Sequence, residues 1–130
     1  MIRKSSLDEK TEAEIETVIG CGIAVHRALG PGFLEGAYQN AFCLELGIRK
    51  IPHERERSVV VKYRDVPVAL HRIDLVVYEC IIVELKAVNS IESVHVAQVL
   101  SYLKATGFRV GLLMNFGGAT LRDGLRRIVL

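Results

Sequence analysis

Residues 70–86, LHRIDLVVYECIIVELK, read as two strands of mostly β-branched and aliphatic residues joined at Tyr78-Glu79-Cys80. The first strand carries Asp74, and the second carries Glu84 and Lys86. Because side chains alternate along a strand, Glu84 and Lys86 point to one face. The short connection makes the strands neighbours, so Asp74 is expected beside them. Burying such charges costs several kcal/mol unless they are paired, protonated or metal-bound.

A divalent cation gives these charges a chemical purpose. Mg²⁺ prefers oxygen donors and keeps several waters, so one to three carboxylates are enough to hold it. Asp74 and Glu84 supply carboxylates, and the backbone carbonyl of Leu85 is a further candidate donor. Lys86 could activate or orient a water or neutralise a phosphorane-like transition state. The pattern predicts metal-assisted phosphodiester hydrolysis, with a buried Lys86–carboxylate salt bridge as the competing explanation.

The order of apolar patterns predicts one α/β domain over residues 1–130, with residues 1–10 a loosely ordered start. The expected elements are helices up to Leu29, over 34–46 and over 90–105, strands over 58–63, 68–78, 80–88 and 109–116, and a short turn or helix before a strand over 127–130. Gly47 and Gly107 are expected to end helices. A helix between strands of one sheet requires a crossover, so the sheet is mixed and helices flank it.

Three further segments supply candidate site residues. In the expected helix over 90–105, Gln98 and Tyr102 share a face, where they could hold a lysine, a water or a phosphate, or form only a polar edge. Glu35 lies in the first turn of its helix, where the helix dipole alone favours an acid. His26 ends the first helix, where a catalytic role competes with a structural one.

The composition allows a nucleic-acid partner without requiring one. The chain has a formal charge of +2, and the part beyond residue 16 carries +4, which favours a polyanionic ligand. The aliphatic runs are too short to cross a bilayer and residues 1–10 lack an apolar signal region, so we expect a soluble, cytoplasmic protein. Cys21, Cys43 and Cys80 lack metal-site spacing and are expected as reduced, buried thiols.

Taken together, these motifs resemble the PD-(D/E)XK nuclease superfamily. The resemblance rests on Asp74, Glu84-Leu85-Lys86 and Gln98-x-x-x-Tyr102 in that order, and the Gln–Tyr element resembles the RecB-type branch. The segment Gly32-x-x-Glu35-x-x-Tyr38 resembles the small GxxExxY family within it. Further matching segments are His26, Arg72-Ile-Asp74, Glu84-Leu-Lys86-Ala-Val88 and Gly111-Leu-Leu-Met-Asn115-Phe-Gly117. Ile73 stands where the superfamily name has a proline.

The resemblance implies a restriction-endonuclease-like core of order α-α-β-β-β-α-β, with room for a further strand, and a nuclease that uses Mg²⁺ or Mn²⁺. It implies Asp74 and Glu84 as metal ligands, Lys86 as the catalytic lysine, Gln98 and Tyr102 as supporting residues, and Glu35 as an acid and candidate metal ligand at the same site. The expected substrate is nucleic acid, with DNA favoured.

Two other classes stay open on the sequence. One is a nucleic-acid-binding module that keeps the fold without turnover, and the other is an interaction protein, such as a dimer built through the C-terminal strand. Because the chain has no separate recognition domain, a homodimer or a partner protein could supply specificity.

Overall fold

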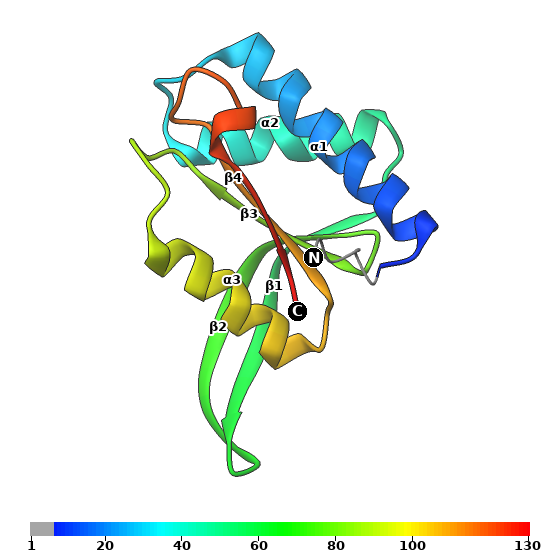
Figure 1. The fold of residues 1–130 in the computed structure, drawn as a ribbon, viewed down its shortest axis with the longest axis vertical. Coiled ribbons are helices and arrows are strands. Elements are labelled where there is room, and N and C mark those ends of the chain that lie inside the picture. The colour runs from blue at the N-terminus through cyan, green and yellow to red at the C-terminus, as the bar shows by residue number, and fades with distance from the viewer. Residues whose placement is uncertain (1–6) are drawn as a thin grey trace, which may run out of the picture.

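The computed structural model describes residues 7–130 as a mixed five-stranded sheet with helices on both faces (Figure 1). The elements in chain order are α1 (Glu9–Leu29), α2 (Glu35–Ile48), β1 (His53–Tyr63), β2 (Val66–Val77), β3 (Ile81–Lys86), α3 (Ser93–Thr106), β4 (Val110–Asn115), the 3₁₀ turn η1 (Arg122–Gly124) and β5 (Leu125–Val129). This arrangement confirms the predicted α/β class with a mixed central sheet, including the additional final strand.

The sheet has the strand order β1-β2-β3-β4-β5. All neighbouring pairs are antiparallel except β3 and β4, which are parallel and are connected through α3. In that parallel pair Glu84 lies opposite Leu113, and Lys86 lies opposite Asn115. The central strands β3 and β4 are almost wholly buried, as expected for strands covered on both faces.

Two hydrophobic cores hold the layers together. One lies between the sheet and the pair α1 and α2, and the other lies between the opposite sheet face and α3. Along β3, Ile81, Val83 and Leu85 face the first core, while Ile82 faces the second. The alternation therefore places Glu84 and Lys86 on the α3 side of the sheet.

The element boundaries agree with most of the sequence patterns, with two corrections. The prediction that Gly47 ends its helix is wrong, because α2 continues to Ile48 and the positive φ falls on Lys50 (57°). The strand β1 begins at His53 and not at Ser58. At the N-terminus, residues 1–6 of the expected loose segment lie outside the described residues, while α1 already begins at Glu9.

The apolar residues at the start of α2 and along it divide between an exposed face and a face that packs on the core. Leu34 is 86% exposed and Leu44 is 66% exposed, whereas Tyr38, Phe42 and Leu46 are completely buried. These three residues recur at i, i+4 and i+8, which is a helical face as regular as the exposed one. Periodicity therefore showed that a helix forms here but could not choose between its two apolar faces.

Tyr38 fixes the turn that delivers α2 to the site. Its hydroxyl donates a hydrogen bond to the Gly30 carbonyl (2.6 Å) and accepts one from the Phe33 amide (3.1 Å). Its ring stacks on Phe116 with 4.7 Å between ring centroids. Gly32 within this turn has φ 114°, a conformation that side chains disfavour. Glycine and tyrosine of the Gly32-x-x-Glu35-x-x-Tyr38 segment thus set the start of α2, where Glu35 lies.

We expect Tyr38→Phe to lower the free energy of unfolding by about 1–2 kcal/mol, because the variant loses both hydroxyl hydrogen bonds in a buried position. Urea denaturation measures this loss. Tyr63→Phe is the matched control, because Tyr63 is 67% exposed. Equal stabilities for the two variants would contradict the structural role of the Tyr38 hydroxyl.

Candidate active site at the fork between β2 and β3

The acids Asp74 and Glu84 meet where the hydrogen-bond ladder between β2 and β3 stops. The ladder pairs Val77 with Ile81, Val76 with Ile82 and Leu75 with Val83, and the next pair in this register is Asp74 and Glu84. At that point carboxylates replace backbone carbonyls as acceptors. The Asp74 amide donates to Glu84 Oε1 (3.0 Å), and the Leu85 amide donates to Asp74 Oδ2 (3.1 Å). The two side chains are therefore locked to each other's strands.

Asp74 is also released from its other neighbour, β1. The register pairs Arg55 with Leu75 and Arg57 with Ile73, but it skips the pair between them, Glu56 and Asp74. Glu56 has φ 52°, which is uncommon for a residue with a side chain and interrupts an extended strand. The pair with Glu56 is missing, and the β2–β3 ladder ends at the same residue. The Asp74 amide is therefore released from strand pairing and donates to the Glu84 carboxylate.

Glu84 is 3% exposed, and its pKa is strongly raised. Burial raises its pKa to about 8, with further contributions from the Asp74 charge and from a hydrogen bond to the Asp74 carboxylate. The Lys86 charge acts in the opposite direction but does not offset them. Two ionised carboxylates in contact repel each other, so without a cation the pair holds a proton near neutral pH.

Lys86 extends from the same strand face and is held by α3. Its Nζ donates a hydrogen bond to Gln98 Oε1 (3.4 Å), and within residues 7–130 no ion pair within 4.0 Å joins it to a carboxylate. The buried salt bridge that competed with the metal interpretation is therefore not what the geometry shows. Tyr102 lies one turn after Gln98 and is 5% exposed. Burial raises the pKa of Tyr102, and the negative charges of Glu84 and Asp74 raise it further.

Glu35 approaches the site from the start of α2 without joining the acid pair. Its side chain is exposed, and its pKa is raised by partial burial and then by the negative charge of Asp74. Positive charges on Lys86 and His95 act in the opposite direction. Within the described residues, no three His, Cys, Asp or Glu side chains are grouped closely enough to hold a metal ion. The structure thus brings Glu35 within electrostatic range of the pair but does not make it a third ligand.

The donor chemistry of the acid pair fits a divalent cation. Each carboxylate uses one oxygen to accept a backbone amide, Oδ2 in Asp74 and Oε1 in Glu84, and no backbone amide of residues 7–130 donates to Oδ1 or Oε2. These two hard oxygens suit Mg²⁺ or Mn²⁺, which complete their coordination with water. A bound cation would also allow both carboxylates to be ionised. The Leu85 carbonyl stays a predicted donor.

Asn115 and Gly117, which belong to a matching segment but were not predicted as site residues, support the ends of β3 and β4. Asn115 accepts hydrogen bonds at Oδ1 from Val88 and Gly117 amides (2.9 and 3.0 Å) and donates from Nδ2 to the Val88 carbonyl (2.9 Å). A Cβ on Gly117 would lie 2.1 Å from that carbonyl, so only glycine fits. On α3, His95 accepts the Glu92 amide at Nδ1, and its charge acts to lower the pKa of Glu35. For Asn115, the signal available in the sequence was an asparagine at the end of an apolar strand, shortly before two glycines.

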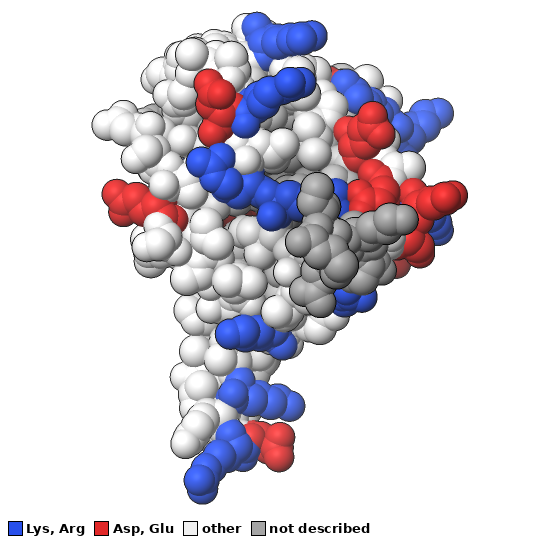
Figure 2. Space-filling view, viewed as in Figure 1, with Lys and Arg blue, Asp and Glu red and all other residues white. Residues whose placement is uncertain are grey.

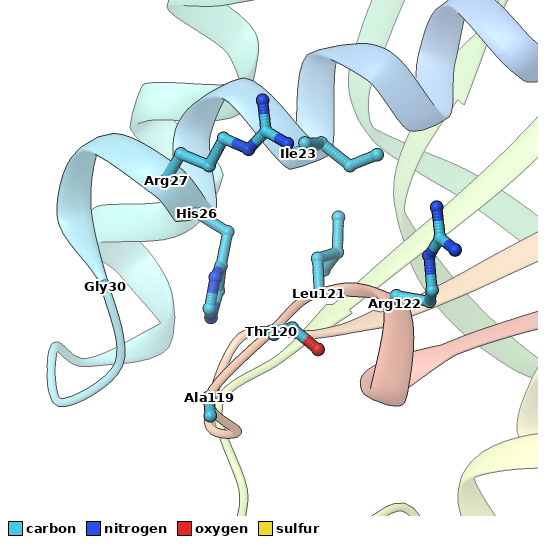
Figure 3. Close-up of a pocket in the computed structure, with 8 residues that line it drawn as sticks. All are labelled: Ile23, His26, Arg27, Gly30, Ala119, Thr120, Leu121 and Arg122. Atoms are coloured by element: carbon cyan, nitrogen blue, oxygen red, sulfur yellow. The ribbon is translucent and has the colours of Figure 1, made fainter.

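His26 is buried by structural hydrogen bonds. Its Nε2 lies 3.2 Å from the Phe116 carbonyl and 2.9 Å from the Gly118 carbonyl, so this nitrogen carries the proton and donates to both. Figure 3 shows its ring pointing from α1 toward the loop after β4. The ring lines a pocket of about 450 Å³, which Arg27 and Arg122 also line. These bonds explain the burial of His26, and its catalytic role stays a prediction.

The three cysteines are free thiols. Cys21 is buried, as expected, whereas Cys43 and Cys80 are only half-buried. Burial is the largest cause of the raised pKa of each thiol. Such thiols are poor nucleophiles at neutral pH.

The structure is an α/β domain with an acid pair and a lysine at the point where the pairing of β2 with β3 ends. Residues 12–128 match the family model of the PD-(D/E)XK nuclease superfamily, and the chain belongs to this superfamily. No curated protein and no solved structure matches the chain. Across residues 7–130, none of the helices combines the length and apolar character that a membrane crossing needs.

The titration of Glu84 predicts how stability depends on pH without metal. Because the folded pKa of about 8 exceeds the ordinary value of 4.5, the folded chain keeps a proton that the unfolded chain releases. This contribution is complete below pH 4.5 and is lost as the pH rises through about 8. In EDTA, the free energy of unfolding of the wild type should fall across that range by about 2–4 kcal/mol more than that of Glu84→Gln.

Urea denaturation at a series of pH values measures the difference. Glutamine keeps the acceptor for the Asp74 amide and removes the titration, while Glu16→Gln on the exposed surface of α1 is the control. Parallel pH profiles for the wild type and Glu84→Gln would contradict the shared proton.

Proposed function

We propose that the protein is a divalent-metal-dependent nuclease that hydrolyses phosphodiester bonds in nucleic acid, with DNA as the substrate. Membership of the nuclease superfamily supports this class of reaction. The observation that carries the proposal is the mutual lock of Asp74 and Glu84 beside a lysine that no carboxylate neutralises by direct pairing within residues 7–130. A merely structural acid pair would gain more from a salt bridge to Lys86 than from sharing a proton.

In this proposal Asp74 and Glu84 hold the cation, and the Leu85 carbonyl is the third protein donor. A bound Mg²⁺ or Mn²⁺ would supply Lewis acidity toward the phosphate and lower the pKa of a water. Lys86 would orient the attacking water or neutralise charge that develops on the phosphoryl oxygens. Its hydrogen bond to Gln98 limits the positions that the ammonium can take, and Gln98 is therefore a positioning residue.

Tyr102 and Glu35 complete the proposed site from two sides. The Tyr102 hydroxyl, on the α3 side, would donate to a phosphate oxygen or to a water. Glu35, on the α2 side, would bind the cation through one of its waters, since it lies within electrostatic range of Asp74 without grouping with it as a ligand. The Gln98–Tyr102 pair supports a RecB-type relationship, and the Gly32–Tyr38 turn supports the GxxExxY assignment.

The decisive measurement is cleavage of a panel of single- and double-stranded DNA and RNA with Mg²⁺, with Mn²⁺ and with EDTA. We expect metal-dependent cleavage, a loss of about 10²–10³-fold in rate for Lys86→Ala, and no cleavage by Glu84→Gln. Lys104→Ala removes an exposed lysine from α3 and is the matched control. Binding of nucleic acid without cleavage in either metal would instead support a non-catalytic binding module.

Glu35 has its own test, because its role depends on the cation. Glu35→Gln should raise the Mg²⁺ concentration needed for half-maximal cleavage by about 10–100-fold, as removal of an outer-shell carboxylate does at other metal sites. Calorimetric titration with Mn²⁺ should show the same weakening, while Glu16→Gln leaves both values unchanged. Unchanged metal binding by Glu35→Gln would return Glu35 to the role of a helix-dipole residue.

A further inference from the structure

The hairpin of β1 and β2 projects beyond the body of the protein as a two-stranded arm (Figure 1). We define the arm as residues 57–72. Within it Val59 is the only residue that is fully buried, and it packs under α3. Arg57 also contacts that side, with its guanidinium 5.3 Å from the Phe108 ring centroid. The base of the arm is thus fixed to the body, while its outer part has no covering element among residues 7–130.

The arm carries the excess positive charge of the whole chain. It contains Arg57, Lys62, Arg64 and Arg72 against the single acid Asp65, a net charge of +3, whereas the complete chain has +2. Figure 2 shows Lys and Arg side chains gathered along this projection. Within the described chain, Lys62, Arg64 and Arg72 form no ion pair within 4.0 Å. Unpaired cations on an extended arm indicate a polyanionic partner.

The outer face of the arm is apolar between its cations. Val68 and Leu70 are 59% and 68% exposed, and they share one face by strand alternation, whereas the register shift after Val61 places Val66, opposite Tyr63, on the other face. Val60 lies opposite Leu70 and adds to this strip. Arg72 has the same parity at the base, and Lys62 and Arg64 lie near the turn. An apolar middle between cationic ends matches a duplex groove, where base edges lie between two rows of phosphates.

We propose that the arm is a duplex-DNA-binding element that lies in the major groove and directs the duplex to the acid pair; this inference rests on the proposed nuclease function. The major groove of B-DNA admits a two-stranded β-ribbon, whereas that of A-form RNA is too deep and narrow. The strand β2 runs from the arm into the acid pair, and Arg72 precedes Asp74 by two residues. A duplex held by the arm therefore continues to the site.

Charge argues against a second copy as the occupant of this face. Two arms paired through their apolar strips would bring together two surfaces of +3, and like-charge juxtaposition costs several kcal/mol. The arm does not carry the acids that would offset this repulsion, apart from Asp65 at the turn. A polyanion has the opposite charge and can approach the whole length of the arm.

Fluorescence anisotropy in EDTA tests the arm without cleavage, on a 20-base-pair DNA duplex and an RNA duplex of the same sequence over a series of salt concentrations. The variant Lys62→Gln/Arg64→Asn removes two cations, and asparagine tolerates the positive φ of Arg64 (50°). The control Lys10→Gln/Lys50→Asn removes two exposed cations elsewhere, and Lys50 also has a positive φ (57°). Thermal melting verifies that both variants fold.

We expect the wild type to bind the DNA duplex more tightly than the RNA duplex. The slope of log K against log salt for DNA should become shallower by about 2 in the arm variant and by less than 1 in the control. Equal slopes for the two variants, or equal binding of DNA and RNA, would overturn the proposal. It would also fail if Val68→Ser/Leu70→Ser converted a dimer to a monomer in sedimentation and left DNA binding unchanged.

The cleavage panel separates this inference from the nuclease proposal. Cleavage of DNA by the wild type, together with unaltered binding and cleavage by the arm variant, would overturn the role of the arm alone. Arm-dependent binding of duplex DNA without cleavage in Mg²⁺ or Mn²⁺ would overturn the nuclease proposal and support the arm.

Discussion

The local release of Asp74 from both neighbouring strands is the constraint on which the site depends. In a regular sheet the Asp74 and Leu85 amides would donate to backbone carbonyls across the ladder. Here they donate to Glu84 and to Asp74 side chains, so the carboxylates are positioned by backbone that cannot rotate away. The same interruption changes the side-chain direction along β2, because Ile73 packs in the α3 core whereas Leu75 packs in the core under α1 and α2. One break thus creates both the acid pair and the bend from which the arm extends.

The rest of the fold stabilises this break. Both cores contact β3, which buries five of its six residues, so the strand that carries Glu84 and Lys86 is rigid on both faces. At its end, the Phe116 amide donates to the Lys86 carbonyl (2.8 Å). Asn115 holds Val88 through two hydrogen bonds, and its Oδ1 also accepts the Gly117 amide. The chain after Lys86 is therefore fixed as firmly as the strand before it. A site with a buried, proton-sharing pair needs such support, since partly satisfied polar groups in a core are costly.

The sequence was sufficient for the parts of the structure that depend on periodicity. Strand alternation placed Glu84 and Lys86 on one face, the short connection placed Asp74 beside them, and helical spacing aligned Gln98 and Tyr102 toward the same side. Periodicity failed where two faces of one element were equally apolar, as in α2, where Leu34 and Leu44 are exposed and Tyr38 and Phe42 are buried. The choice between such faces depends on which one complements the sheet, and that information lies in tertiary contacts.

The features that no local pattern could predict are those in which the backbone departs from regular geometry. Glu56 gives no sign in sequence of a left-handed conformation, yet its φ of 52° accompanies the missing pair with Asp74. Strand-like residues on both sides of Asp74 predicted a continuous ladder, and in such a ladder the acids would face each other with their amides already occupied. The position of Glu35 likewise follows from the Gly30–Phe33 turn that Tyr38 holds, which lies far from Asp74 in sequence. The chemistry of this site therefore arises less from the motif residues themselves than from the irregular backbone that frees the Asp74 amide for the Glu84 carboxylate.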